Sequence, residues 1–255
     1  MYARREIVKG AATLPLAAIL ADPLLARAAA ATTENVTTTL KDGSTVGAAV
    51  AYPEAKSAPA VLLVHEWWGL NDQIKSVAVE LAREGYVALA VDLYGGNVAS
   101  TPDDAGQYMK AVKPEVATET LQTWVSWLRE NERTTDYVGT VGWCFGGGWA
   151  LNAAIATPVE ATIVYYGSVA RDAEALKALK GPVLGHFAEQ DKWINKEMVD
   201  GFIEQMKLAG QPAPEVYWYD ADHAFANPSG GRYDREDAQL AWSRSLAFLQ
   251  KNLTA

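Results

Sequence analysis

Cysteine is almost absent from the chain, since Cys144 is the only one among 255 residues. One thiol cannot close a disulfide within its own chain, which excludes that kind of cross-link as a source of stability. Basic runs are absent beyond the first ten residues, and the formal net charge at pH 7 is −9. These absences argue against binding to nucleic acid or to an anionic membrane surface, and they favour a small neutral or weakly charged ligand.

The beginning of the chain lacks a hydrophobic run long enough to span a membrane. Within residues 1–31, a basic start with Arg4 and Arg5 precedes an apolar stretch, and small residues suited to cleavage follow it. Because Pro15 and Asp22 interrupt the apolar stretch, it is shorter than the ~20 residues that a spanning helix needs. The order of the three parts predicts a twin-arginine-type export signal, and therefore a periplasmic protein. The alternative is an amphipathic N-terminus on a cytoplasmic protein.

Residues 32–255 alternate strand-like and helix-like segments and contain no repeat, low-complexity tract or linker past residue 35. A hairpin is expected around Asp42 and Gly43, a pair that tolerates the positive φ of a tight turn. Further strands are expected over residues 58–68, 86–94, 137–143, 161–167, 182–191 and 214–220. Helices are expected over residues 72–84, 116–130, from about 145, and over 172–180, 195–209 and 235–251. This alternation predicts one α/β domain with a mostly parallel central sheet, an antiparallel N-terminal hairpin and helices on both faces.

The cysteine lies in the segment 142–146, which fits the pattern G-x-C-x-G between an expected strand and an expected helix. This is the nucleophile elbow of α/β hydrolases with cysteine in place of serine. The glycines let strand and helix approach closely, and the helix N-terminus is expected to favour a thiolate and so lower the pKa of Cys144. The alternative is a structural cysteine at a glycine-rich helix start.

Two residues that could activate this thiol follow it at the ends of later strands. Asp191 and His223 come after Cys144 in the order nucleophile, acid, histidine that this fold uses. We expect His223 to take the thiol proton or to hold the thiolate as an ion pair, and Asp191 to orient the imidazole. The three residue types in this order predict a catalytic triad.

An oxyanion hole in this fold uses the N–H after the nucleophile and one from the loop after the early strand, here the amides of Phe145 and Trp67. Glu66 precedes that loop at the end of a hydrophobic strand. An ionised carboxylate is costly there unless it faces a polar cleft, so we expect Glu66 to point at the active site. The alternative is a surface carboxylate at a strand end.

The motifs HEWWGLN, DLYGG, GWCFGGG, YYGS, EQD and DHAF run in this order over roughly residues 36–251. In these motifs the chain resembles the dienelactone hydrolase (carboxymethylenebutenolidase) family of cysteine hydrolases. The resemblance implies that Glu66 partners the resting thiol and helps to generate the thiolate when substrate arrives. It also implies arginines that bind a substrate carboxylate, but this sequence has Gly96 and Asn227 at those places. The nearest basic candidates are Arg232 and Arg235.

Aromatic residues cluster near the expected strand ends, where this architecture binds ligands. We expect substrate contacts from Trp68, Tyr94, Tyr166, Trp193 and Phe225, although packing is the alternative for each of them. Two further histidines, His65 and His186, lie inside apolar strands and are expected to be hydrogen-bonded core residues.

The sequence therefore predicts an exported hydrolase that cleaves a small ester or lactone through an acyl-cysteine intermediate. A hydrolase of this kind is expected to need no cofactor. No metal is expected either, because HEWWG lacks the second histidine of a zinc-binding helix. The protein is expected to be a monomer or a small homo-oligomer, with no membrane contact after removal of the signal. The alternative function is that of a non-catalytic ligand-binding or thiol-sensing protein on the same fold.

Overall fold

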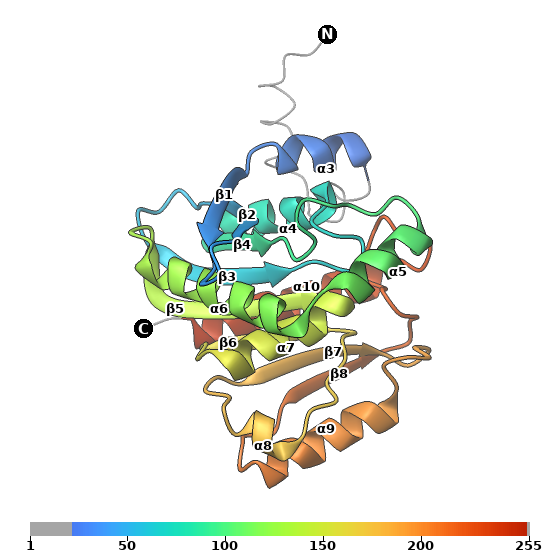
Figure 1. Ribbon diagram of the computed structural model, residues 1–255. Helices are drawn as coiled ribbons and strands as arrows, with labels where there is room; N and C mark the ends of the chain where they lie inside the picture. Colours follow the sequence, from blue (N-terminus) through green and yellow to red (C-terminus); the bar gives the residue numbers. More distant parts are fainter. Residues whose placement is uncertain (1–21, 254–255) are drawn as a thin grey trace.

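The computed structural model describes residues 22–253, so most of the predicted export signal lies outside the described residues. At its centre is an eight-stranded sheet with the order β1-β2-β4-β3-β5-β6-β7-β8 (Figure 1). Strands β3 to β8 run parallel to one another, while β2 is antiparallel to both of its neighbours. The strands are β1 (Glu34–Thr39), β2 (Thr45–Ala51), β3 (Ala58–Val64), β4 (Val87–Val91), β5 (Thr134–Trp143), β6 (Ala161–Tyr165), β7 (Val183–Ala188) and β8 (Glu215–Tyr219). The predicted α/β fold with its antiparallel N-terminal hairpin is confirmed.

The sequence patterns account for this pairing. Residues 61–64, the C-terminal half of β3, are apolar and fully buried, as expected for a strand that is covered on both faces. The hairpin turns at Gly43, whose φ of 86° is a conformation that glycine adopts without strain. The amide of Leu40 closes the turn by donating to the carbonyl oxygen of Ser44 at 2.9 Å.

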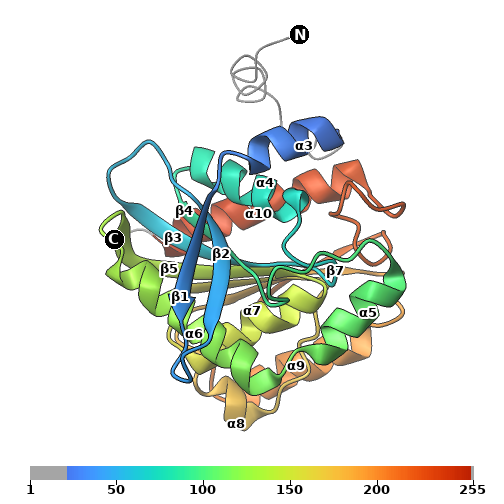
Figure 2. The same ribbon diagram turned by 45° about the horizontal axis from the view of Figure 1, so that its top comes forward.

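Helices cover the sheet on both faces, and each face has its own apolar cluster. In Figure 2, α3, α4 and α10 lie on one side of the sheet, and α6, α7 and α9 lie on the other. The helices are α3 (Pro23–Ala30), α4 (Asp72–Arg83), α5 (Pro102–Ala111), α6 (Pro114–Glu130), α7 (Phe145–Ala156), α8 (Ala173–Leu176), α9 (Lys196–Leu208) and α10 (Arg235–Asn252). Within residues 22–253, no helix is both long and apolar enough to cross a membrane.

Within residues 32–253, helices α5 and α8 differ most from the prediction. Helix α5 was not predicted, because Ala105 is its one buried residue and the apolar periodicity is therefore weak. Its local signals are a capping Thr101, which accepts from the amide of Asp104 at 3.2 Å, and Pro102 in the first turn. Helix α8 is shorter than predicted because the chain after it tightens into turns, in which Leu179 donates to the carbonyl oxygen of Leu176 at 3.1 Å.

Helix α3 falls within the predicted export signal and packs on α4. Its residues Ala26, Ala29 and Ala30 are buried, and the Ser76 hydroxyl of α4 donates to the carbonyl oxygen of Ala26 at 2.7 Å. The prediction of an export signal did not foresee this helix.

Candidate active site

Cys144 occupies a strained bend between β5 and α7. Its φ of 54° and ψ of −119° are unfavourable for a residue with a side chain, and such strain is typical of functional sites. A Cβ atom at Gly142 would collide with the carbonyl oxygen of Gly146, and one at Gly146 would collide with those of Val64 and His65. The two glycines of the motif are therefore needed for the strand, the bend and the helix to fit together.

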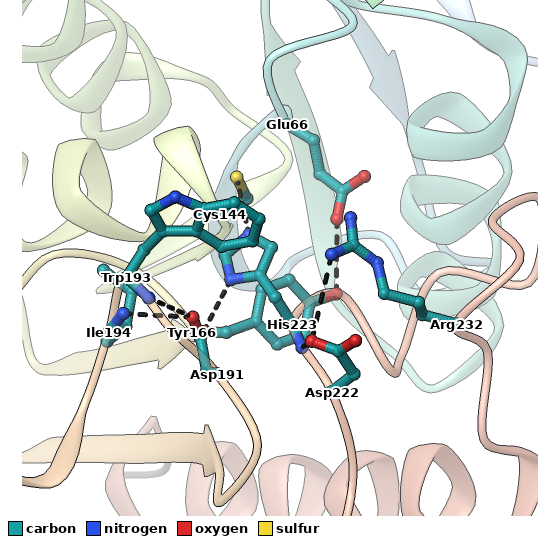
Figure 3. Close-up of polar contacts among 9 residues, drawn as sticks. All are labelled: Glu66, Cys144, Tyr166, Asp191, Trp193, Ile194, Asp222, His223 and Arg232. Atoms are coloured by element: carbon teal, nitrogen blue, oxygen red, sulfur yellow. Dashed lines mark hydrogen bonds and ion pairs between the residues drawn. The ribbon is translucent and has the colours of Figure 1, made fainter.

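The three predicted triad residues meet at this bend (Figure 3). Nε2 of His223 lies 3.1 Å from Sγ of Cys144, and Nδ1 of His223 lies 2.6 Å from Oδ2 of Asp191. The second carboxylate oxygen of Asp191 accepts the amides of Trp193 at 2.8 Å and Ile194 at 3.1 Å. Asp191 is thus fixed by the loop that follows it, and it fixes the imidazole in turn.

The thiol is held in its protonated form. Burial and then the negative charge of Glu66 raise the pKa of Cys144 to about 12. The amides of Phe145 and Trp67 both act on the thiol and lower its pKa, but they do not outweigh burial. The prediction that the helix N-terminus lowers the pKa below its ordinary value was therefore wrong. Both amides named as oxyanion donors do lie beside the sulfur.

Glu66 faces the interior of the site. The residue is 3% exposed, so it is not a surface carboxylate. Its two oxygens accept from the Tyr166 hydroxyl at 3.3 Å and from the side-chain amide of Asn227. Burial raises the pKa of Glu66, although the Asn227 amide and the His223 charge partly offset this. The resemblance implied that Glu66 partners the resting thiol, but in this structure the thiol lies against His223 instead.

Asn227 therefore holds Glu66, although the sequence singled it out only as the place of a missing arginine. Arg232 comes from the same segment and points toward the site in Figure 3. Its guanidinium is 3.8 Å from Oδ1 of Asp222 and 5.6 Å from the ring centroid of Trp193, and its charge lowers the pKa of Glu66. Arg235 instead begins helix α10. The sequence could not show which of the two arginines faces the site.

Two aromatic residues flank the imidazole of His223. The ring centroid of Trp193 lies 5.2 Å from it, and Trp193 is 60% exposed. Tyr166 is also 5.2 Å away but is fully buried. Phe225 is fully buried behind Tyr166, with ring centroids 5.4 Å apart. Phe225 thus supports Tyr166 in the core, and the predicted substrate contact would need the site to open because no surface of Phe225 is accessible.

Trp68 is half-buried, and its ring meets that of Trp67 edge-on, with ring centroids 5.1 Å apart. Tyr94 is buried and packs on Phe145, with ring centroids 5.7 Å apart. Its hydroxyl has no hydrogen-bond partner within the described part of the chain. Tyr94 lies close enough to Cys144 for the thiol to act on its pKa, and the substrate contacts expected of Trp68 and Tyr94 stay predictions.

Both remaining histidines are core residues, as predicted. His65 and His186 have no exposed surface, and each has both ring nitrogens in hydrogen bonds. No group of three or more His, Cys, Asp or Glu residues suited to a metal ion occurs among residues 22–253.

Comparisons with known proteins identify a family that the chain resembles over most of its length. Residues 46–253 match the family described as the dienelactone hydrolase family. "Protein usf" of Aquifex pyrophilus is 30% identical over 224 residues, covering 84% of this chain and 96% of its own. The carboxymethylenebutenolidase of Pseudomonas putida is 29% identical over 232 residues, covering 85% of this chain and 96% of its own.

A solved structure has the same fold. It is a dienelactone hydrolase-like promiscuous phosphotriesterase from metagenomic libraries, with a TM-score of 0.79 and 20% sequence identity. The likeness covers 87% of this chain and 99% of that protein.

Proposed function

The chain belongs to the dienelactone hydrolase family, and from this membership we propose that it cleaves a small ester or lactone through an acyl-cysteine intermediate. The proposal rests on the hydrogen bonds that connect Cys144, His223 and Asp191. Sγ of Cys144 lies 3.1 Å from Nε2 of His223, and Nδ1 of His223 lies 2.6 Å from Oδ2 of Asp191. The oxyanion amides of Phe145 and Trp67 lie beside the same sulfur.

Acylation begins when Nε2 of His223 takes the thiol proton and Sγ of Cys144 attacks the carbonyl carbon. The carbonyl π electrons move onto oxygen, and the amides of Phe145 and Trp67 stabilise this negative charge. When the tetrahedral intermediate collapses, the carbon–oxygen bond of the ester or lactone breaks. The imidazolium of His223 gives its proton to the departing oxygen, which leaves a thioester on Cys144.

Deacylation repeats these steps with water. His223 removes a proton from a water molecule, whose oxygen attacks the thioester carbonyl carbon. The intermediate expels the sulfur, which regains a proton from the imidazolium of His223, and the carboxylic acid leaves. Asp191 stays ionised throughout and holds Nδ1 of the imidazole in position.

Glu66 acts through its charge. It attracts the imidazolium of His223, which favours transfer of the proton from thiol to imidazole, and it also raises the pKa of the free thiol. We propose that the resting enzyme therefore keeps a neutral thiol, and that Glu66 assists thiolate formation only while substrate occupies the site. A thiol sensor needs a readily ionised sulfur, so the raised pKa of Cys144 disfavours the thiol-sensing alternative.

Hydrolysis of a panel of small esters and lactones by the full chain and by Cys144→Ala tests the proposal. We expect turnover by the unaltered protein and its loss in Cys144→Ala, with an unchanged unfolding midpoint. Binding of panel members without turnover would instead support a non-catalytic ligand-binding protein.

We further propose that the protein is exported to the periplasm. The support is the order of basic, apolar and small residues in 1–31 and the paired Arg4 and Arg5. Replacing both arginines by lysine should move esterase activity from the periplasmic to the cytoplasmic fraction. Equal periplasmic activity in both proteins would contradict export by this route.

A further inference from the structure

We propose that His65 is a positioning residue for the oxyanion site. Its imidazole holds the peptide group between Glu66 and Trp67 so that the Trp67 N–H faces the oxygen on which negative charge develops. The inference rests on the proposed function, since oxyanion donors matter only if Cys144 attacks a carbonyl carbon.

The hydrogen bonds of His65 determine where its proton lies. The backbone N–H of Leu93 can only donate, and it lies 3.2 Å from Nε2 of His65. The carbonyl oxygen of Glu66 can only accept, and it lies 2.5 Å from Nδ1. The imidazole therefore carries its proton on Nδ1 and donates it to Glu66. Burial lowers the pKa of His65, so the ring stays neutral at pH 7.

This donation sets the direction of the next N–H. In a trans peptide group, the C=O and the N–H point in opposite directions. The C=O of Glu66 is held by His65 and also accepts from the amide of Gly69 at 3.2 Å. The N–H of the same peptide group belongs to Trp67, and it acts on the Cys144 thiol. Rotating this peptide would break the bond to His65 and turn the oxyanion donor away from the sulfur.

The imidazole is itself held on both sides. Its ring centroid lies 4.7 Å from that of Tyr94 and 5.9 Å from that of Phe145, which supplies the second oxyanion N–H. The backbone of His65 also lies directly against Gly146, where a Cβ atom would collide with its carbonyl oxygen. His65 thus contacts both segments that provide oxyanion donors, although it contacts no reacting atom.

Two substitutions separate the two hydrogen bonds. In His65→Asn, the side-chain NH₂ can replace Nδ1 and still donate to Glu66, whereas the contact of Nε2 with Leu93 is lost. In His65→Gln, the longer side chain can accept from Leu93 as Nε2 does, but the donor to Glu66 is lost. Both variants lose the aromatic ring, so each serves as the control for the other.

The readouts are kcat and KM for para-nitrophenyl acetate and the inhibition constant of phenethyl trifluoromethyl ketone. Addition of Cys144 to this ketone produces a tetrahedral oxyanion. Loss of one oxyanion donor typically lowers kcat about 10² to 10³-fold, so mispositioning should cost part of that. We expect His65→Gln to lower kcat about tenfold to a hundredfold with KM little changed, and to weaken the inhibitor by a similar factor. His65→Asn should keep most of both.

A merely structural role for His65 predicts other results. Equal losses in the Asn and Gln variants, a loss confined to KM, or an unchanged inhibition constant would each overturn the inference. If the unaltered protein hydrolyses no ester, the proposed function fails instead, so the two failures are distinguishable.

The unaltered protein gives a second test that does not depend on the folding of variants. Nitrogen NMR of protein with isotope-labelled histidine should show His65 as the neutral tautomer with its proton on Nδ1. A proton on Nε2 would overturn the inference, because Nδ1 could not then donate to Glu66.

Discussion

His186 on β7 and His223 in the loop after the neighbouring strand β8 have nearly the same hydrogen-bond pattern but different surroundings. His223 links the Cys144 thiol, 3.1 Å from Nε2, to the Asp191 carboxylate, 2.6 Å from Nδ1. His186 links the Ser245 hydroxyl, 2.9 Å from Nε2, to another polar group on Nδ1, the Tyr219 hydroxyl at 2.8 Å. Judged by distances alone, each histidine could activate a nucleophile, Cys144 beside His223 and Ser245 beside His186.

The surroundings of the two imidazoles differ in the charge of their partners and in their exposure. His186 is fully buried with neutral hydroxyl partners, and burial and then the charge of Arg244 lower its pKa to about 3. His223 has a carboxylate partner and lies beside the exposed Trp193. A carboxylate stabilises an imidazolium, whereas two hydroxyls do so only weakly. Hydrogen-bond geometry therefore does not distinguish a catalytic histidine from a structural one, but the charge of its partner and its access to ligand do.

The largest expected difference is between His223→Asn and His186→Asn. The first removes the general base, and we expect kcat/KM for para-nitrophenyl acetate to fall at least about 10³-fold. The second removes a core hydrogen bond, and we expect kcat/KM to change less than about tenfold while the protein unfolds more easily. Steady-state kinetics and thermal unfolding of both variants check this. Similar kinetic losses in the two variants would show that His223 and His186 do not differ in role.

The next-largest expected difference is between the two groups that contact Nδ1, Asp191 at His223 and Tyr219 at His186. Asp191→Asn removes the charge that stabilises the imidazolium and should lower kcat about 10² to 10³-fold. Tyr219→Phe removes the corresponding partner of His186. It should cost about 1 to 3 kcal/mol in unfolding free energy and leave kcat within about threefold. Denaturant unfolding and kinetics measure both, and a larger kinetic loss in Tyr219→Phe would contradict the assignment of roles.

Glu66→Gln should raise the reactivity of the free Cys144 thiol and lower the rate of ester hydrolysis. Because the negative charge of Glu66 raises the pKa of Cys144, its removal should let the thiol react with dithiodipyridine at lower pH. The same change removes a charge that stabilises the imidazolium, so kcat for ester hydrolysis should fall about tenfold. An alkaline shift of thiol reactivity would mean that Glu66 itself accepts the thiol proton.

The smallest expected effect is that of replacing Arg232, with replacement of Arg244 as the comparison. Arg232 lies at the site and is half-exposed, whereas Arg244 donates to the Tyr219 hydroxyl at 3.0 Å. Arg232→Ala should lower kcat/KM about threefold to tenfold for esters with a free carboxylate and leave neutral esters unchanged. Arg244→Ala should show no such selectivity. Equal effects of Arg232→Ala on charged and neutral esters would exclude a substrate-binding role.

The sequence predicted the parts of the site that depend on chain order. Asp191 ends a predicted strand, Cys144 and His223 each follow one, and parallel strands bring their carboxyl ends to one edge of a sheet. The elbow was recognisable because its glycines have a local steric cause. The antiparallel hairpin was also recognisable, since its turn needs a positive φ at Gly43.

Other features depend on packing between distant segments, and the sequence does not encode these locally. The pKa of the thiol depends on how deeply α7 and the loop after β3 bury it, so its direction was predicted wrongly. The bond between Asn227 and Glu66 joins residues 161 positions apart. The direction of Arg232 depends on a loop with no periodic pattern. The role proposed for His65 depends on the orientation of the peptide group between Glu66 and Trp67, which sequence motifs do not show.

Mass spectrometry of protein quenched during ester turnover would detect the acyl group that we propose Cys144 carries as a covalent intermediate. The peptide containing Cys144 should gain the mass of the substrate acyl group, and the same peptide of Cys144→Ala should gain none. Turnover that proceeds without acyl label on Cys144 and survives in Cys144→Ala would exclude the acyl-cysteine mechanism.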